Sequence, residues 1–181
     1  MKKTVLTFGL ISGIIISLLM LVTVPFHDQI GFDRGLVVGY TTMLAAFLLI
    51  YFGVRSYRDN VAGGSVKFGR AFAVGALIAL ISSVMYTATW EVIYFGGFMP
   101  DFLPKYQAHV IESERAKGAT PQELEKKTAE LKSMAEMYKN PILNAGMTLL
   151  EPLPVGLVVA LISAVVLSRK RRVVGAMAAV A

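Results

Sequence analysis

The sequence contains no cysteine, which excludes disulfide bonds, thiolate chemistry and cysteine-based metal sites. It also lacks the usual motifs of catalysis, with no Ser-His-Asp arrangement, no H-E-x-x-H and no phosphoryl-transfer pattern. Only two histidines are present, His27 and His109, and neither stands at a recognised metal-ligand spacing. We therefore predict a protein that is not an enzyme and that carries no cofactor and no metal.

Charge is nearly absent from four long apolar runs, residues 4–24, 35–54, 71–92 and about 147–167. A helix that crosses the ~30 Å hydrocarbon core of a bilayer needs about 20 mostly apolar residues, and each run is long enough. The sequence thus predicts an all-α, polytopic membrane protein with four transmembrane helices. The first run is too long for the core of a cleaved signal peptide, so we expect it to be retained as a span.

The basic residues are concentrated on one side of these runs. Residues 1–3, 55–70 and 169–172 together hold ten basic residues and one acidic residue, whereas the remainder holds eight basic and eleven acidic residues. Because Lys and Arg are retained in the cytoplasm, both termini are predicted to be cytoplasmic and residues 96–141 to face outward. The net charge of +6 then serves orientation, so we expect the lipid bilayer as a partner and no nucleic acid.

Between the third and fourth spans, residues 101–139 predict an outward, amphipathic helical hairpin. Asp101 is placed to cap its first helix, and Gly118 fits the position that follows the end of that helix. Thr120-Pro121-Gln122-Glu123 has the pattern of a capping box with proline at the first helical position. The apolar stripe of the second helix is too narrow for a separate core, so it must lie against the first helix, the membrane or a partner.

Small residues recur four apart in every span, and they allow helix backbones to approach closely where lipid gives no hydrophobic drive for association. This spacing predicts a compact four-helix bundle, and it leaves open whether the small residues meet within one chain or in a homo-oligomer. The glycines expected at helix contacts are Gly9, Gly13, Gly35, Gly39, Gly75 and Gly156. We treat residues 1–172 as one membrane domain that includes the hairpin, followed by a short tail, residues 173–181.

Two carboxylates, Glu91 and Glu151, are predicted near the outer membrane boundary, where an ionisable group is costly. Pro152 either starts the fourth span afresh or kinks it, which frees backbone carbonyls nearby. One interpretation joins Glu91, Glu151 and Tyr40 in an outward-facing proton or cation site beside a broken helix. The other interpretation has Glu151 capping the helix that Pro152 opens, while Arg34 neutralises one of the acids.

Several short motifs occur in a recognisable order, namely Arg58-Asp59, Gly63-Gly64, Phe68-Gly-Arg-Ala71-Phe72-x-x-Gly75 and Pro154-x-Gly156. With them, residues 4–172 resemble a family of small bacterial four-pass membrane proteins known only as a domain of unknown function. The resemblance implies a location in the bacterial inner membrane and no assigned activity, and it supplies no functional residues.

Two functional hypotheses follow. The first is a non-enzymatic scaffold or interaction module whose bundle presents the outward hairpin to a protein partner or to a second copy of the chain. The alternative is a small proton- or cation-linked transporter. A tightly packed protomer leaves no room for a wide pore, so this transporter would act as an oligomer.

Overall fold

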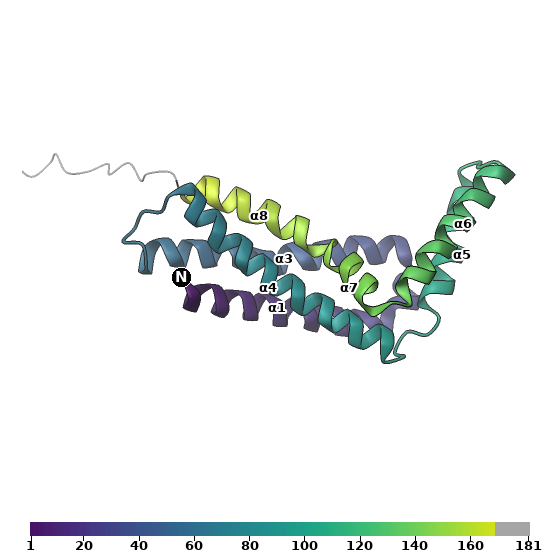
Figure 1. Cartoon of the computed structure of the whole chain (residues 1–181), viewed down its shortest axis with the longest axis horizontal. Helices are drawn as coiled ribbons and strands as arrows, with labels where there is room; N and C mark the ends of the chain where they lie inside the picture. Colours follow the sequence, from purple (N-terminus) through teal and green to yellow (C-terminus); the bar gives the residue numbers. More distant parts are fainter. Residues whose placement is uncertain (169–181) are drawn as a thin grey trace, which may run out of the picture.

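The computed structural model describes residues 1–168 and consists of a bundle of four long helical segments with a helical hairpin at one end (Figure 1). The described residues contain no strand, and the predicted all-α class is confirmed. Four segments are long and apolar enough to cross a membrane, and they are Lys2–Ile30, Phe32–Asn60, Phe68–Phe95 and Pro141–Leu167. The basic residues 169–172 and the predicted tail 173–181 lie outside the described residues.

The four segments differ in how continuous they are. The second and third are the single helices α3 (Phe32–Asn60) and α4 (Phe68–Phe95). The first is made of α1 (Lys2–Thr23), the 3-10 turn η1 (Val24–Phe26) and α2 (His27–Ile30). The fourth is made of α7 (Pro141–Leu149) and α8 (Pro152–Leu167).

The fourth segment starts earlier than the expected residue 147. Asn140 caps α7, since its Oδ1 atom accepts hydrogen bonds from the backbone N–H groups of Ile142 and Leu143 at 3.0 and 3.3 Å. The helix then breaks before Pro152, because proline has no N–H to donate and its ring clashes with the preceding turn. Pro152 therefore starts a new helix, α8, and Glu151 stands at its N-terminal boundary.

Helices α3 and α4 form the centre of the bundle, and each packs against both α1 and α8. Small residues allow these contacts. A Cβ atom on Gly75 would lie 2.8 Å from the Cβ atom of Ala160, and one on Gly156 would lie 2.8 Å from that of Ala79. These glycines therefore bring the backbones of α4 and α8 together, as expected for helix packing in lipid.

Helix α1 is joined to its neighbours by both close packing and hydroxyl hydrogen bonds. Gly9 and Gly13 face α4. A Cβ atom added to Gly9 would lie 3.0 Å from the Cβ atom of Ile81, and one added to Gly13 would lie 3.0 Å from that of Met85. The hydroxyl of Ser12 donates to the carbonyl oxygen of Ala46 on α3 at 3.0 Å. Three further polar contacts between α1 and α4 involve Ser17, Ser82 and Thr89. In hydrocarbon such hydroxyls need protein partners, and these bonds provide them.

The hairpin consists of α5 (Phe102–Ala116) and α6 (Pro121–Tyr138). It lies at the opposite end of the bundle from the N-terminus and the last turn of α8, and it leans away from the bundle axis (Figure 1). Gly118 follows α5 with a φ of 89°, which favours glycine, and Thr120 and Glu123 form the expected capping box. Asp101 differs from expectation, because its side chain makes no capping hydrogen bond.

The apolar stripe of α6 is used within the hairpin. Leu131 is buried, and the side-chain amide of Gln107 on α5 donates to the carbonyl oxygen of Leu131 at 3.0 Å. The exposed side of the hairpin carries ion pairs between neighbouring turns, among them Lys127 with Glu130 at 3.2 Å. The contact between α5 and α6 thus covers part of the stripe, and Tyr138 at its end packs against the ring of Tyr94 on α4.

Candidate binding cavity between the hairpin and the bundle

A cavity of about 640 Å³ lies where the first turns of α3 face the hairpin helix α5, α7 and the end of α4 nearest the hairpin. Its wall is largely apolar and rich in methionine and aromatic side chains. The aromatic residues that line it are Phe32, Tyr40, Tyr86, Trp90, Phe102, Tyr106 and Tyr138. Cavities of this size and composition are typical of small-molecule sites in proteins.

Gly35 and Gly39 contribute to this cavity and do not pack against another helix. A Cβ atom added at either position would meet nothing within 4 Å, and both residues line the cavity wall. The sequence predicts a helix contact for them either within one chain or between copies, and the contact within one chain is absent from residues 1–168. The reason is that α7 packs chiefly against α4, so the first turns of α3 have no close helical neighbour within the described chain.

Glu151 lies in the cavity wall at the break between α7 and α8. Its carboxylate makes no capping hydrogen bond to α8 and instead accepts a hydrogen bond from the hydroxyl of Tyr86 at 3.2 Å. Glu151 remains exposed because it faces the open space, and Tyr40 of α3 lines the same cavity. The structure thus places two of the four sequence-predicted site residues, Glu151 and Tyr40, around one space.

Glu91 and Arg34 lie elsewhere. Glu91 stands five positions after Tyr86, about 140° further around α4, and it is absent from the cavity wall. Its Oε1 atom is buried and has no hydrogen-bond partner among residues 1–168. Arg34 lines an adjoining hollow beside Asp28 and Lys105, and it forms no ion pair with a described acid. In residues 1–168 no group of three or more His, Asp or Glu side chains is placed to hold a metal ion.

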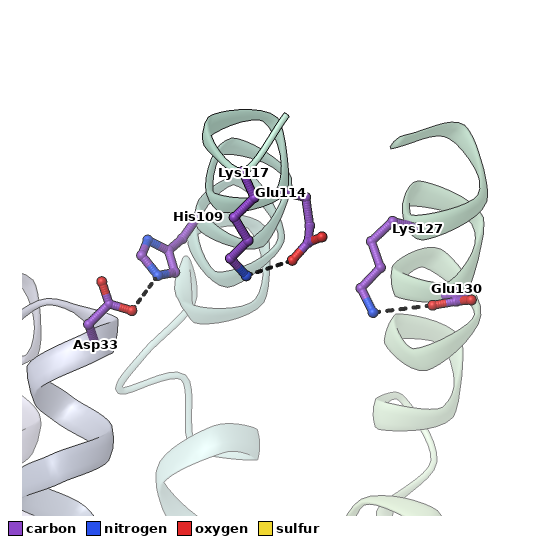
Figure 2. Close-up of polar contacts among 6 residues, drawn as sticks. All are labelled: Asp33, His109, Glu114, Lys117, Lys127 and Glu130. Carbon is purple, nitrogen blue, oxygen red and sulfur yellow. Dashed lines mark hydrogen bonds and ion pairs between the residues drawn. The ribbon is translucent and has the colours of Figure 1, made fainter. Parts of the chain in front are cut away.

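The hairpin is attached to the start of α3 and to α2 by polar and aromatic contacts. The ammonium of Lys105 lies 2.8 Å from the carboxylate of Asp28, and this hydrogen bond raises the pKa of Lys105. Figure 2 shows the imidazole of His109 directed toward Asp33, with Nε2 and Oδ1 separated by 3.2 Å. The ring of Phe32 also stacks on that of His109, with centroids 5.1 Å apart.

Further ring contacts extend this attachment into the cavity. Phe32 packs against Tyr106, and Phe102 packs edge to face against Trp90 of α4, with centroid distances of 5.6 and 5.1 Å. The same side chains line the cavity. The contacts that hold the hairpin in place therefore also form part of the cavity wall.

Comparison with known proteins identifies the family. Residues 7–169 match the DUF4199 family, whose members are described as proteins of unknown function. The chain belongs to this family. No curated protein and no solved structure matches the chain. The family resemblance expected from the sequence is confirmed, and it supplies no activity for this DUF4199 member.

In this DUF4199 chain, the fully buried side chain of Asn144 joins three parts of the site, and the sequence analysis missed it. Its Oδ1 atom accepts hydrogen bonds from the indole N–H of Trp90 and the hydroxyl of Thr148, both at 3.2 Å. Its amide donates to the carbonyl oxygen of Tyr138 at the end of the hairpin, at 3.3 Å. Asn144 precedes the predicted run, which starts at about residue 147, but it lies inside the observed segment Pro141–Leu167, where polar groups require partners.

Proposed function

We propose that this protein is a non-enzymatic, multi-pass protein of the bacterial inner membrane that binds a small molecule in the cavity between the hairpin and the bundle. The observation that carries the proposal is the cavity of about 640 Å³, whose wall is more apolar than polar and is rich in aromatic side chains. Ligand sites usually have volumes of roughly 300–1,000 Å³ and walls with an apolar majority. Glu151 and Tyr86 form one polar part of the wall, and charged side chains such as Asp33 form another at the hairpin end.

The charge distribution supports an orientation in which the hairpin is outside the cytoplasm. The N-terminus, the basic 55–70 connection and the end of α8 lie at one end of the bundle, and the hairpin lies at the other (Figure 1). Lys and Arg are retained in the cytoplasm, so both termini belong there. The cavity then opens toward the periplasmic side.

The packing favours a binding site that is closed toward the cytoplasmic end. Phe47, one turn beyond the cavity-lining Met43 on α3, is completely buried and lies beside Gly156 of α8. A proton- or cation-linked transporter with this site would therefore need a rearrangement or a second copy to move its ligand inward. Glu151 and Tyr40 would be the residues that contact the ligand in such a transporter.

The proposal is tested by identifying what the cavity holds. The full chain is purified in native lipid, and bound small molecules are compared by mass spectrometry with those of Gly39→Leu. The added side chain has open space in which to extend, so Gly39→Leu should fold and lose the ligand. Val37→Leu, at a position on the same helix that is 68% exposed and absent from the wall, is the control and should retain it. Equal retention by both variants would rule out the cavity as the site.

A second candidate function is that of a scaffold or interaction module. It is favoured by the fixed attachment of the hairpin, which would present the exposed face of α6 in one orientation. The test is crosslinking in native membranes of the full chain and of a chain lacking residues 101–139. The shortened chain should no longer crosslink to a partner or to a second copy. Lys126→Glu on the exposed face of α6 should give the same loss without opening the cavity. Association that survives both changes would contradict this function.

A further inference from the structure

We infer that the cavity binds a hydrophobic organic cation, a molecule with one positive charge and an aromatic or alkyl body. This inference rests on the proposed binding function and names the class of ligand. It follows from three features of the cavity, namely an acid without a counter-cation, a wall of aromatic rings, and a single carboxylate at the place where an inorganic ion would need several charged ligands.

The formal charges in the wall are unequal. Lys117 is the basic residue among them, and it already pairs with Glu114 at 2.9 Å. Asp33 faces the imidazole of His109, and the remaining histidine of the wall, His27, packs edge to face on Phe32 and Phe102. These groups all lie near the hairpin, and the charge of Lys117 is neutralised there by Glu114.

Glu151 is left without a cation. The hydroxyl of Tyr86 is its hydrogen-bond donor, and no Lys, Arg or His among residues 1–168 lies within ion-pair distance of its carboxylate. Tyr40 and Tyr138, the other titratable side chains in this part of the wall, are hydroxyls that bring no positive charge at neutral pH. A cationic ligand would supply the missing charge, whereas an anion would be repelled.

The aromatic wall favours the same charge. The rings of Trp90 and Phe102 are in contact, and Phe102 and Tyr106 stack with their planes within 10°. The face of an aromatic ring carries negative potential, so it attracts ammonium groups. Tyr86 places a further ring beside Glu151. Aromatic rings and a carboxylate are the kinds of side chain that bind alkylated ammonium ions.

An inorganic cation does not fit this site. Mg²⁺ requires about six oxygen ligands and Ca²⁺ six to eight. Near Glu151 the wall offers neutral hydroxyls, those of Tyr40, Tyr86, Tyr138 and Thr148, together with apolar side chains such as Met43 and Met147. Among residues 1–168 no further acidic or histidine side chains join Glu151 in a group that could hold a metal ion. A volume of about 640 Å³ also far exceeds a single ion. The apolar wall instead gains free energy by covering a hydrocarbon body.

The chain contains a single tryptophan, and this residue, Trp90, lies in the cavity wall. Its emission therefore reports occupancy directly. The full chain in an uncharged maltoside detergent, which carries no ammonium group of its own, is titrated with three probes of similar size, namely benzyltrimethylammonium, its uncharged carbon analogue neopentylbenzene, and benzylsulfonate. We expect the cation to change Trp90 emission at the lowest concentration and the anion to have no effect.

Glu151→Gln should weaken the cation by about tenfold or more, equivalent to about 1.4 kcal/mol, and leave the neutral probe unchanged. Glu91→Gln removes a carboxylate at the same end of the bundle that is absent from the wall, and it should change neither affinity. Thermal unfolding of both variants checks that they are folded. Equal affinity for the cation and the neutral probe, equal loss in the two variants, or preference for the anion would overturn the inference and leave the binding function standing. No response of Trp90 to any probe would contradict both.

Discussion

One substitution, glycine to alanine, should have opposite effects on stability at two glycines of the bundle. At Gly156 the new Cβ atom would lie 2.8 Å from the Cβ atom of Ala79 and 3.3 Å from the ring of Phe47. Unstrained carbon atoms rest about 3.5–4.0 Å apart, so α4 and α8 must separate or the core must shift. At Gly39 the same methyl group meets nothing within 4 Å.

The magnitudes follow from two contributions. Replacing a glycine inside a helix by alanine gains about 0.5–1 kcal/mol, and this contribution is common to both positions. Overpacking a filled core costs about 1–3 kcal/mol, and this contribution applies at Gly156 alone. The free energies of unfolding of Gly39→Ala and Gly156→Ala should therefore differ by about 1–3 kcal/mol. For a chain of this length that corresponds to about 2–12 °C in melting temperature.

The assay is thermal unfolding in nanodiscs followed by circular dichroism, with a compensating variant as the internal control. Gly156→Ala combined with Ala79→Gly moves one methyl group from α4 to α8 and should recover most of the loss. If Gly39→Ala destabilises the chain as much as Gly156→Ala, or if the double variant recovers nothing, then the assignment of one glycine to a helix contact and the other to a cavity is refuted.

Three further predictions concern the hairpin and its attachment. Asn144→Ala leaves the indole N–H of Trp90 without an acceptor, so the free energy of unfolding should fall by about 1–3 kcal/mol, measured by thermal unfolding. Phe32→Ala removes ring contacts to α5, each worth about 0.5–1.5 kcal/mol, so trypsin should cleave the hairpin faster while the spans stay protected. Hydrogen bonds from Thr120, first from its backbone N–H and to a smaller extent from its hydroxyl, hold the pKa of Glu123 below its ordinary 4.5. Its contribution to stability is present above pH 4.5 and is lost as the pH falls through the lower folded-state pKa, so the stability advantage over Glu123→Gln should close in acid.

The features that the sequence predicts well are those that depend on neighbouring residues. Each span is recognised from the length and hydropathy of one run, and the capping box from Thr120 and Glu123 three positions apart. A break or kink at Pro152 also follows from the chemistry of a single residue, and the structure shows the break. No knowledge of the tertiary arrangement is needed for these predictions.

The cavity depends on how separate helices diverge, and the local pattern does not contain that information. Gly35 and Gly39 have the same spacing as Gly9 and Gly13, yet the first pair faces open space and the second faces α4. Glu151 was expected either to cap α8 or to join an ion site, and its contact with Tyr86 joins residues 65 positions apart. Glu91 lies in the sequence between Trp90 and Tyr94, aromatic residues of the kind found at the membrane interface. Its position around α4 nevertheless places it outside the cavity wall.

The length of α3 indicates whether a ligand would enter this cavity from the membrane or from water. Its 29 residues extend about 44 Å, whereas the hydrocarbon core is about 30 Å thick. If the excess is shared between the two ends, the end nearest the hairpin projects about 7 Å into the headgroup layer. The cavity-lining stretch of α3 from Phe32 to Met43 covers about 17 Å and so crosses from headgroups into hydrocarbon. Amphipathic molecules accumulate at that depth by partition, so the concentration of the proposed ligand that matters for binding is the one in the leaflet on the hairpin side and not the one in the adjoining water.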